Sequence, residues 1–158
     1  MPHFPLADAL TDSSDGTDSA AGPYRALLLS DTGGLTQFGA FIEILPPGSG
    51  SSLKHWHANE DEMIHMLAGE VTLLEGDTTT ILHPGDTATF KAGMALGHCL
   101  HNHSDAEARY LVIGTRGPAD VITYPDHDRV LHFTRSPLQR RYTDLQGQPA
   151  DSPYRKPG

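Results

Sequence analysis

The residues of this sequence that are best suited to chemistry are histidines and acidic residues gathered in one short segment. Residues 54–70 read KHWHANEDEMIHMLAGE and contain three histidines and four acidic residues. Imidazole and carboxylate groups bind divalent transition metals and also carry protons. On a strand, His55 and His57 project from one face, with their Cα atoms roughly 7 Å apart. On a helix this spacing would turn the two rings about 200° apart, which excludes the helical histidine pair of zinc proteases.

Glu62 follows His57 after the polar residues 58–61, ANED. If these residues form a turn between antiparallel strands, the second strand returns beside the first and brings Glu62 within reach of both rings. Ile64 and Met66 then share the face of Glu62, because side chains alternate along a strand. The segment therefore predicts a cluster of metal ligands at one end of an apolar lining.

A fourth ligand is available in residues 85–102, GDTATFKAGMALGHCLHN. His98 lies 41 residues after His57, far enough for the intervening strands to bring it back beside the first hairpin. On a strand, Leu100 and Asn102 share its face, whereas Cys99 faces the other way. The apolar lining is expected to leave few polar groups in the cavity.

These residues must be positioned by short strands. The chain of 158 residues is the size of one domain, and its apolar fraction of 37% is low, with 16 Gly and 12 Pro. No segment keeps a helical apolar repeat over twelve positions, and candidate strands recur about every 8–12 residues. Residues 62–76, EMIHMLAGEVTLLEG, read as one long bent strand. The sequence thus predicts an all-β sandwich or barrel.

Composition narrows the possible partners and location. The net charge of −9 opposes binding to nucleic acid. No apolar run is long enough to span a membrane, and residues 1–10 do not resemble a secretory signal. The lone cysteine, Cys99, excludes an internal disulfide and favours a reducing compartment. We therefore expect a cytoplasmic protein whose partner is a small molecule.

The chain divides into three parts by composition. Residues 1–22 are acidic, small and polar, and are predicted to be flexible. Residues 23–134 supply the strands of the barrel. Residues 135–158 form a basic, Pro-rich extension that is predicted to wrap the barrel or to reach a second subunit. Exposed strand edges need cover, so a homodimer is expected.

The first cluster of ligands resembles the first motif of the cupins. In this sequence the motif runs from Gly50 through His55-x-His57, four residues, Glu62, six residues and Gly69. The spacing of the histidines, the glutamate and the second glycine is that of the family.

The second cupin motif is matched by residues 85–102. It begins at Gly85 and ends with His98, three residues and Asn102. Lys91 stands where the family usually has proline, and four residues rather than two separate Gly93 from the histidine. The resemblance covers roughly residues 36–116. It implies a jelly-roll β-barrel that binds one divalent transition metal through His55, His57, Glu62 and His98.

Two classes of function fit such a site. Three imidazoles and one carboxylate suit Fe, Mn, Zn, Ni or Co and leave coordination positions free for a substrate. The protein is predicted to be a metal-dependent oxygenase, isomerase or lyase acting on a small oxygenated metabolite. The alternative is a non-catalytic protein whose metal anchors a sugar or carboxylate. Residues 123–128, TYPDHD, and the C-terminal stretch also look like those of small single-domain bacterial cupins, some of which are thought to act on sugar phosphates.

Overall fold

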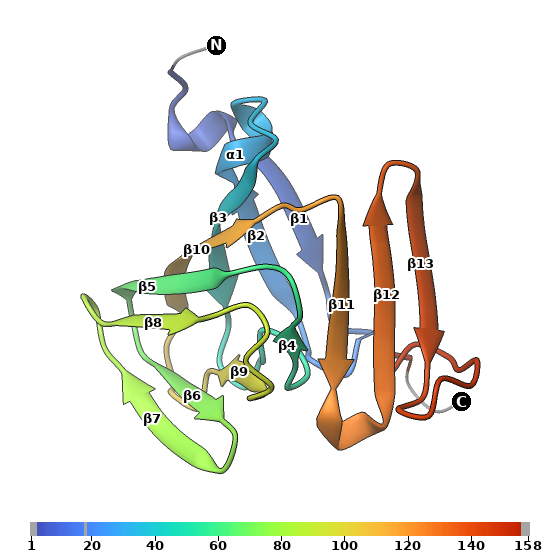
Figure 1. Ribbon diagram of the computed structural model, residues 1–158. Helices are drawn as coiled ribbons and strands as arrows, with labels where there is room; N and C mark the ends of the chain where they lie inside the picture. The colour runs from blue at the N-terminus through green and yellow to red at the C-terminus, as the bar shows by residue number, and fades with distance from the viewer. Residues whose placement is uncertain (1–2, 18, 156–158) are drawn as a thin grey trace.

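The computed structural model describes residues 3–17 and 19–155, and most of its regular structure is β-strand. Three antiparallel sheets form the molecule (Figure 1). The six-stranded sheet has the order β1 (Leu10–Ser14), β2 (Tyr24–Leu28), β3 (Phe38–Leu45), β10 (Ala108–Thr115), β5 (Glu62–Ala68) and β8 (Thr87–Phe90). This confirms the predicted all-β class.

The two smaller sheets complete the fold. The three-stranded sheet has the order β7 (Thr78–Leu82), β6 (Val71–Glu75) and β9 (His98–His101). The four-stranded sheet has the order β13 (Leu138–Thr143), β12 (Arg129–Arg135), β11 (Ala119–Tyr124) and β4 (Trp56–His57). Helical structure in the described residues is limited to α1 (Leu29–Thr32) and the short 3-10 turns η1 (Leu6–Asp8) and η2 (Pro125–His127).

The hydrophobic core lies between the six-stranded and the three-stranded sheets. Its most buried side chains come from β3, β5, β6 and β10, because every second residue of these strands points inward. As predicted, Ile64 and Met66 are buried, each 1% exposed. The other core members are Leu45, Val71, Leu73, Leu82, Phe90, Leu100, Ala108, Tyr110 and Val112.

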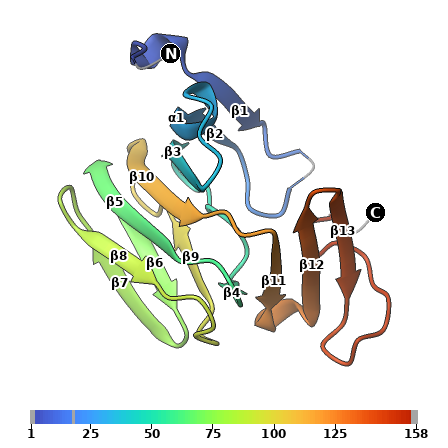
Figure 2. The ribbon, with the colours of Figure 1, turned by 45° about the horizontal axis from the view of Figure 1, so that its top comes forward.

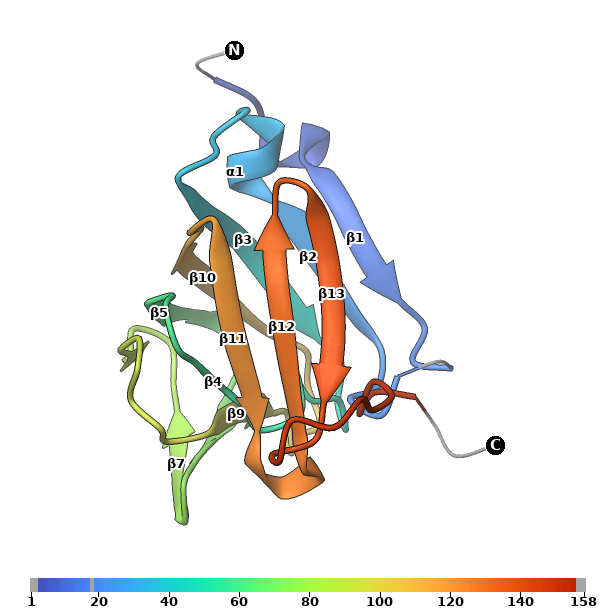
Figure 3. The same ribbon diagram turned by 45° about the vertical axis from the view of Figure 1, so that its right-hand side comes forward.

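The four-stranded sheet stands as a separate layer beside this barrel. Figures 2 and 3 show β11, β12 and β13 side by side, apart from β5 and β8. The short strand β4 connects the two parts, since it pairs with β11 while the residue before it bridges to β9. The segment that carries two candidate ligands therefore lies where the sheets meet.

The N-terminal part of the chain is more ordered than its composition suggests. Residues 7–22 were expected to lack structure, but Leu10–Ser14 form β1 along the edge of β2. Most side chains of β1 are exposed, so the strand needs no apolar pattern. Its pairing depends on backbone hydrogen bonds and on a bond from the Tyr24 hydroxyl to Asp12.

The long strand predicted for residues 62–76 is broken at Gly69. Gly69 has φ +71°, a left-handed conformation that favours glycine. A Cβ atom there would lie 2.5 Å from the carbonyl oxygen of Glu107. The chain therefore ends β5 and starts β6 in a different sheet.

The C-terminal boundary also differs from the prediction. Residue 134 falls inside β12, and β13 follows it as the edge of the same sheet. The segment that was expected to be an extension after residue 134 is thus partly a strand of the four-stranded sheet. No helix in the described residues has the length and apolar character needed to cross a membrane.

Candidate metal centre

Backbone pairing brings the three candidate histidines together. His57 lies in β4, and His55 forms an isolated bridge with His98 at the start of β9. Two hydrogen bonds close this bridge, from His55 N to His98 O at 3.1 Å and from His98 N to His55 O at 2.9 Å. The centroid of the His55 ring consequently lies 4.9 Å from that of His98 and 5.0 Å from that of His57.

Glu62, the first residue of β5, faces these rings. Its Oε1 lies 3.5 Å from His98 Nε2, and its Oε2 lies 3.9 Å from His57 Nε2. Potential ligand atoms of His55, Glu62 and His98 all lie within 4.8 Å of one another. All four residues selected from the sequence are therefore close together. His57 lies outside the group of three and contacts it through the Glu62 carboxylate.

Hydrogen bonds fix which nitrogen of two rings is free. His55 Nδ1 donates to the carbonyl oxygen of Leu53 at 2.8 Å, and His57 Nδ1 donates to Asp120 Oδ2 at 2.6 Å. The carbonyl oxygen and the carboxylate oxygen have no proton to donate, so each Nδ1 carries the proton of its hydrogen bond. The Nε2 atom of each neutral ring then offers its lone pair. The Nε2 atoms of His57 and His98 are buried and have no hydrogen-bond partner among the described residues. Buried polar atoms normally have partners, so these two nitrogens, with the Glu62 carboxylate beside them, are suited to bind a metal ion.

The charges of the group also suit a cation. Burial, together with the charges of the neighbouring His57 and His98, lowers the pKa of His55 to about 4. Burial alone would raise the pKa of Glu62, but the interaction with His98 and the charges of the other histidines lower it overall. A neutral imidazole beside an ionised carboxylate is the state in which these groups bind metal.

Asp120 of β11 is a functional residue that sequence reasoning missed. Its side chain is fully buried, and its Oδ1 accepts hydrogen bonds from the backbone N–H groups of Asn59 at 2.9 Å and Val121 at 2.8 Å. Burial would raise the pKa of Asp120, but the bonds from His57 and these N–H groups lower it. Burial would likewise lower the pKa of His57, but the bond to Asp120 and the charge of Glu62 raise it.

A second group of potential ligands supports the first. His57, Glu60 and Asp120 have ligand atoms within 4.8 Å of one another. Glu60, expected in a solvated turn, instead pairs with Arg135 and accepts a bond from the N–H of Gly117. Since both carboxylates are already engaged, this group holds His57 in place.

A cavity of about 180 Å³ opens directly onto His55, Glu62 and His98. Of the two apolar residues expected on the face of Glu62, Ile64 lines the cavity, whereas Met66 is buried in the core. The wall is more polar than predicted, because Glu43, Ser51, Ser52 and Tyr110 also belong to it. Its other apolar lining residues include Phe41, Phe90 and Leu100.

The cavity adjoins a larger cleft of about 490 Å³. The two spaces share three wall residues, Phe41, Glu43 and Ser51. Strands β1 and β2 and Tyr154 form the rest of the cleft wall. The N-terminal strand and the C-terminal segment, both expected to lie outside the barrel, therefore border the approach to the candidate centre.

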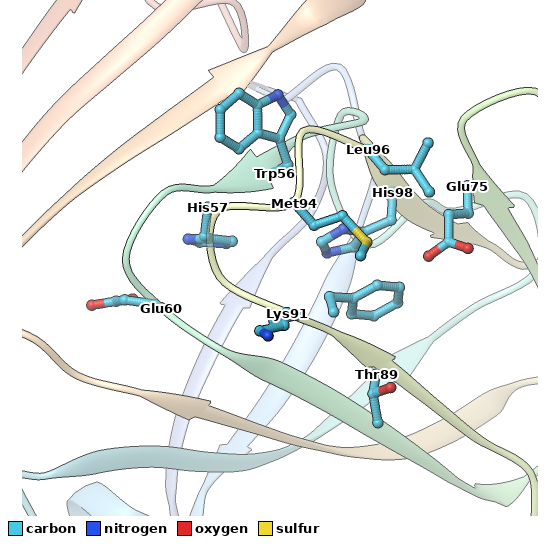
Figure 4. Close-up of a pocket in the computed structure, with 10 residues that line it drawn as sticks. Trp56, His57, Glu60, Glu75, Thr89, Lys91, Met94, Leu96 and His98 are labelled. Carbon is cyan, nitrogen blue, oxygen red and sulfur yellow. The ribbon is translucent and has the colours of Figure 1, made fainter.

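The opposite side of the centre is nearly filled. The loop between β8 and β9 carries Met94 and Leu96 close to the His98 ring, with His57 on the other side of the loop (Figure 4). Only about 20 Å³ of space remains there. The Phe90 ring stacks on His98 with centroids 3.6 Å apart and an interplanar angle of 3°. A small molecule can approach from the cavity and the cleft, and a second open cleft of about 550 Å³ also reaches Glu62 beside Phe90 and Met94.

Comparison with known proteins identifies the family. The cupin domain model matches residues 41–114. A cupin-superfamily protein from Silicibacter pomeroyi, described as a sugar phosphate isomerase, is 31% identical, with a TM-score of 0.85, and the match covers 98% of this chain and all of the other. The chain belongs to the cupin superfamily. The resemblance and the jelly-roll cupin fold predicted from the two motifs are confirmed.

Other solved cupins are more distant. An inferred sugar phosphate isomerase from Acidithiobacillus ferrooxidans is 26% identical over 82% of this cupin and 81% of its own chain, with a TM-score of 0.75. A predicted oxalate decarboxylase from Thermotoga maritima is 19% identical over 70% of this chain and 96% of its own, with a TM-score of 0.58, and shares the fold. Comparison with curated protein sequences gives no match.

Proposed function

We propose that this cupin is a metal-dependent isomerase that moves a carbonyl group along a small, sugar-like molecule. One divalent transition ion, Fe, Mn, Zn, Ni or Co, would be held by His55, His57, Glu62 and His98. The observation that carries the proposal is the pair of buried, unpartnered Nε2 atoms that face the Glu62 carboxylate at the end of a cavity.

The residues present fit such an ion. Two imidazoles hold their proton on Nδ1, away from the cavity, and the carboxylate supplies negative charge. When bound, a divalent ion in this position polarises a carbonyl oxygen and favours the enediolate form of the substrate. The chain's own residues would orient that oxygen through the hydroxyl and carboxyl groups that line the cavity.

Two observations favour isomerisation over the oxygenase and lyase chemistry that the same ligands permit. The relative from Silicibacter pomeroyi, aligned over its whole length, is described as a sugar phosphate isomerase. Moreover, a buried carboxyl group, Glu43, and several hydroxyl groups line the cavity and the cleft beside the candidate ligands. Hydroxyl and carboxyl groups match a polyhydroxylated substrate through hydrogen bonds.

Metal content tests the ligand set. His57→Ala is expected to lower the metal content of the purified protein roughly tenfold or more, since even residues behind the ligands change metal affinity about 10–100-fold. His65→Ala is the matched control, because His65 faces outward and bonds to the hydroxyl of Thr87. Elemental analysis of both variants, purified without added metal, gives the answer. Full metal content in His57→Ala would remove His57 from the centre.

Activity is tested with protein reloaded with each of the five metals. Ribose, xylose, glucose and their phosphates, incubated in D₂O, are followed by proton NMR for aldose–ketose conversion and loss of the C2 proton. Conversion of at least one sugar is expected. Metal-dependent thermal stabilisation by a sugar without conversion would favour the alternative, a non-catalytic binding protein.

Two further properties are proposed with the function. The lone Cys99, free in the structure, agrees with a cytoplasmic location, and the net charge of −9 agrees with a small-molecule partner rather than nucleic acid. A homodimer is proposed because exposed strand edges need cover.

A further inference from the structure

Glu43 is a buried carboxyl group that nothing described so far explains. Among the described residues, the buried carboxyl and imidazole side chains are those of Glu43 at 8%, His98 at 4% and Asp120 at 1% exposure. His98 belongs to the candidate centre, and Asp120 accepts three hydrogen bonds. Glu43 forms no ion pair with any residue in the described ranges. Carboxyl groups are rarely buried unless paired, so a buried, unpaired one indicates a function.

The neighbours of Glu43 place it on the path to the centre. It lies on β3 opposite Tyr110 of β10, whose hydroxyl interacts with the carboxyl at a geometry outside that of a regular hydrogen bond. Glu43 is also one of three residues shared by the walls of the cavity and the cleft. A molecule that reaches Glu62 and His98 from the cleft must therefore pass the Glu43 carboxyl.

We propose that Glu43 is the catalytic residue that removes a proton from one substrate carbon and returns it to the next. This assignment rests on the isomerase function proposed above.

The proton transfer balances without an oxidant or reductant. Glu43 takes the proton from the hydroxyl-bearing carbon beside the carbonyl, and the C–H electron pair becomes the C=C bond of an enediolate as the carbonyl oxygen gains the negative charge. One proton then passes from the neighbouring hydroxyl to that oxygen. Glu43 returns its proton to the former carbonyl carbon while the neighbouring oxygen forms the new C=O bond.

The electrostatics of the site support this role. Burial, the largest cause, together with the charge of Glu62 raises the pKa of Glu43 to about 8 when no cation is bound beside Glu62. A proton-transfer group works best when its pKa lies near the working pH. The phenols on the same walls stay protonated and cannot accept a proton near neutral pH, because burial raises the pKa of Tyr24 to about 12 and that of Tyr110 well above its usual value.

The decisive experiment compares Glu43→Gln with the wild type, both fully loaded with metal. Glutamine keeps the size of the side chain but cannot accept the proton. For the sugar that the wild type converts, we expect the rate of aldose–ketose conversion to fall roughly 100-fold or more in kcat, in line with the ~10²–10⁴-fold contribution of acid–base groups. KM should change by less than about threefold, because general acid–base catalysis acts in the transition state. Glu107→Gln, at an exposed carboxylate paired with Arg109, is the control and should keep the wild-type rate.

The pH profile separates proton transfer from a structural role. A base must be ionised, so the wild-type rate should fall as the pH drops through the pKa of Glu43. Glu43→Asp should retain part of the conversion rate with this acidic limb displaced, and Glu43→Gln should lose the limb. Conversion within about threefold of wild type in Glu43→Gln, or a loss explained by lower metal content or melting temperature, would overturn the assignment. Absence of aldose–ketose conversion in the wild type for every sugar would instead show that the proposed function is wrong, and the role of Glu43 with it.

Discussion

Asp120 acts on the candidate centre through His57. Its carboxylate accepts the Nδ1 proton at 2.6 Å and is itself held by two backbone N–H groups. The imidazole consequently cannot rotate or change tautomer without breaking a buried, charge-assisted hydrogen bond. A carboxylate behind a histidine ligand also makes that ligand more basic.

We therefore predict that Asp120→Asn weakens metal binding about 10–100-fold, although Asp120 lies outside the ligand set. The amide can donate to Nδ1 and so stabilise the tautomer whose proton is on Nε2, where the metal would bind. Metal affinity measured by competition with a chromophoric chelator checks the prediction. Asp86→Asn, at an exposed turn carboxylate that accepts a bond from the N–H of His83, is the control. Equal affinity in both variants would contradict the role given to Asp120.

The site residues that local rules predict lie close together in the sequence. Those that the sequence missed are positioned by contacts between segments far apart in the sequence. His55 and His57 could be selected because strand alternation is a local rule. The hairpin predicted to bring Glu62 beside them is wrong, because β4 pairs with β11 while β5 pairs with β10 and β8, and Glu62 instead faces the histidines from another sheet. Glu43 and Asp120 reach the site through pairings between distant segments, β3 with β10 and β4 with β11. A single acidic residue in an otherwise ordinary strand gives no signal before those pairings are known.

At the scale of secondary-structure elements, Gly69 decides where β5 ends. Its φ of +71° and the 2.5 Å distance from the Glu107 carbonyl oxygen to a Cβ atom added there leave room only for hydrogen. The turn from β5 to β6 transfers the chain from the six-stranded to the three-stranded sheet. The relative positions of Glu62, at the start of β5, and of His98, on the strand beside β6, depend on that transfer.

Gly69→Ala is predicted to destabilise the protein by roughly 2–4 kcal/mol, since backbone strain of about 1–2 kcal/mol is joined by a clash with backbone atoms. Gly85→Ala isolates the strain, because Gly85 has φ +95° but no atom within 4 Å of an added Cβ. It should cost only about 1–2 kcal/mol. Urea unfolding of the two variants gives the comparison. A Gly69→Ala variant no less stable than Gly85→Ala would show that the chain relieves the clash by moving.

The elements most poorly predicted are those whose stability comes from pairing alone. Strand β1 has mostly exposed side chains and therefore no apolar alternation for a sequence pattern to detect. The strands that enclose the core alternate buried and half-buried positions, as in β10, and were recognised. The cupin barrel was thus predictable from its packing, whereas its N-terminal edge was not.

At the scale of the whole molecule, two sheets end in edges that carry exposed apolar side chains. Leu10 of β1 is 56% exposed and Leu138 of β13 is 67% exposed. β1 and β13 are the terminal strands of their sheets among the described residues. Unpaired backbone groups next to apolar side chains favour association with another chain.

We predict that the protein is a homodimer in solution, with a mass twice the 17.1 kDa of the chain, and that at least one of these edges lies in the interface. Leu10→Lys and Leu138→Lys place a charge on each edge, and the double variant should be monomeric by light scattering because burying an unpaired lysine is costly. Leu35→Lys, at an exposed position in the turn after α1, is the control and should leave the dimer intact. A monomeric wild type would contradict the homodimer, and a dimer that persists in the double variant would exclude both edges.

The cleft wall includes residues of β1, so loss of the dimer through Leu10 should also lower sugar conversion, which links assembly to the approach of the substrate.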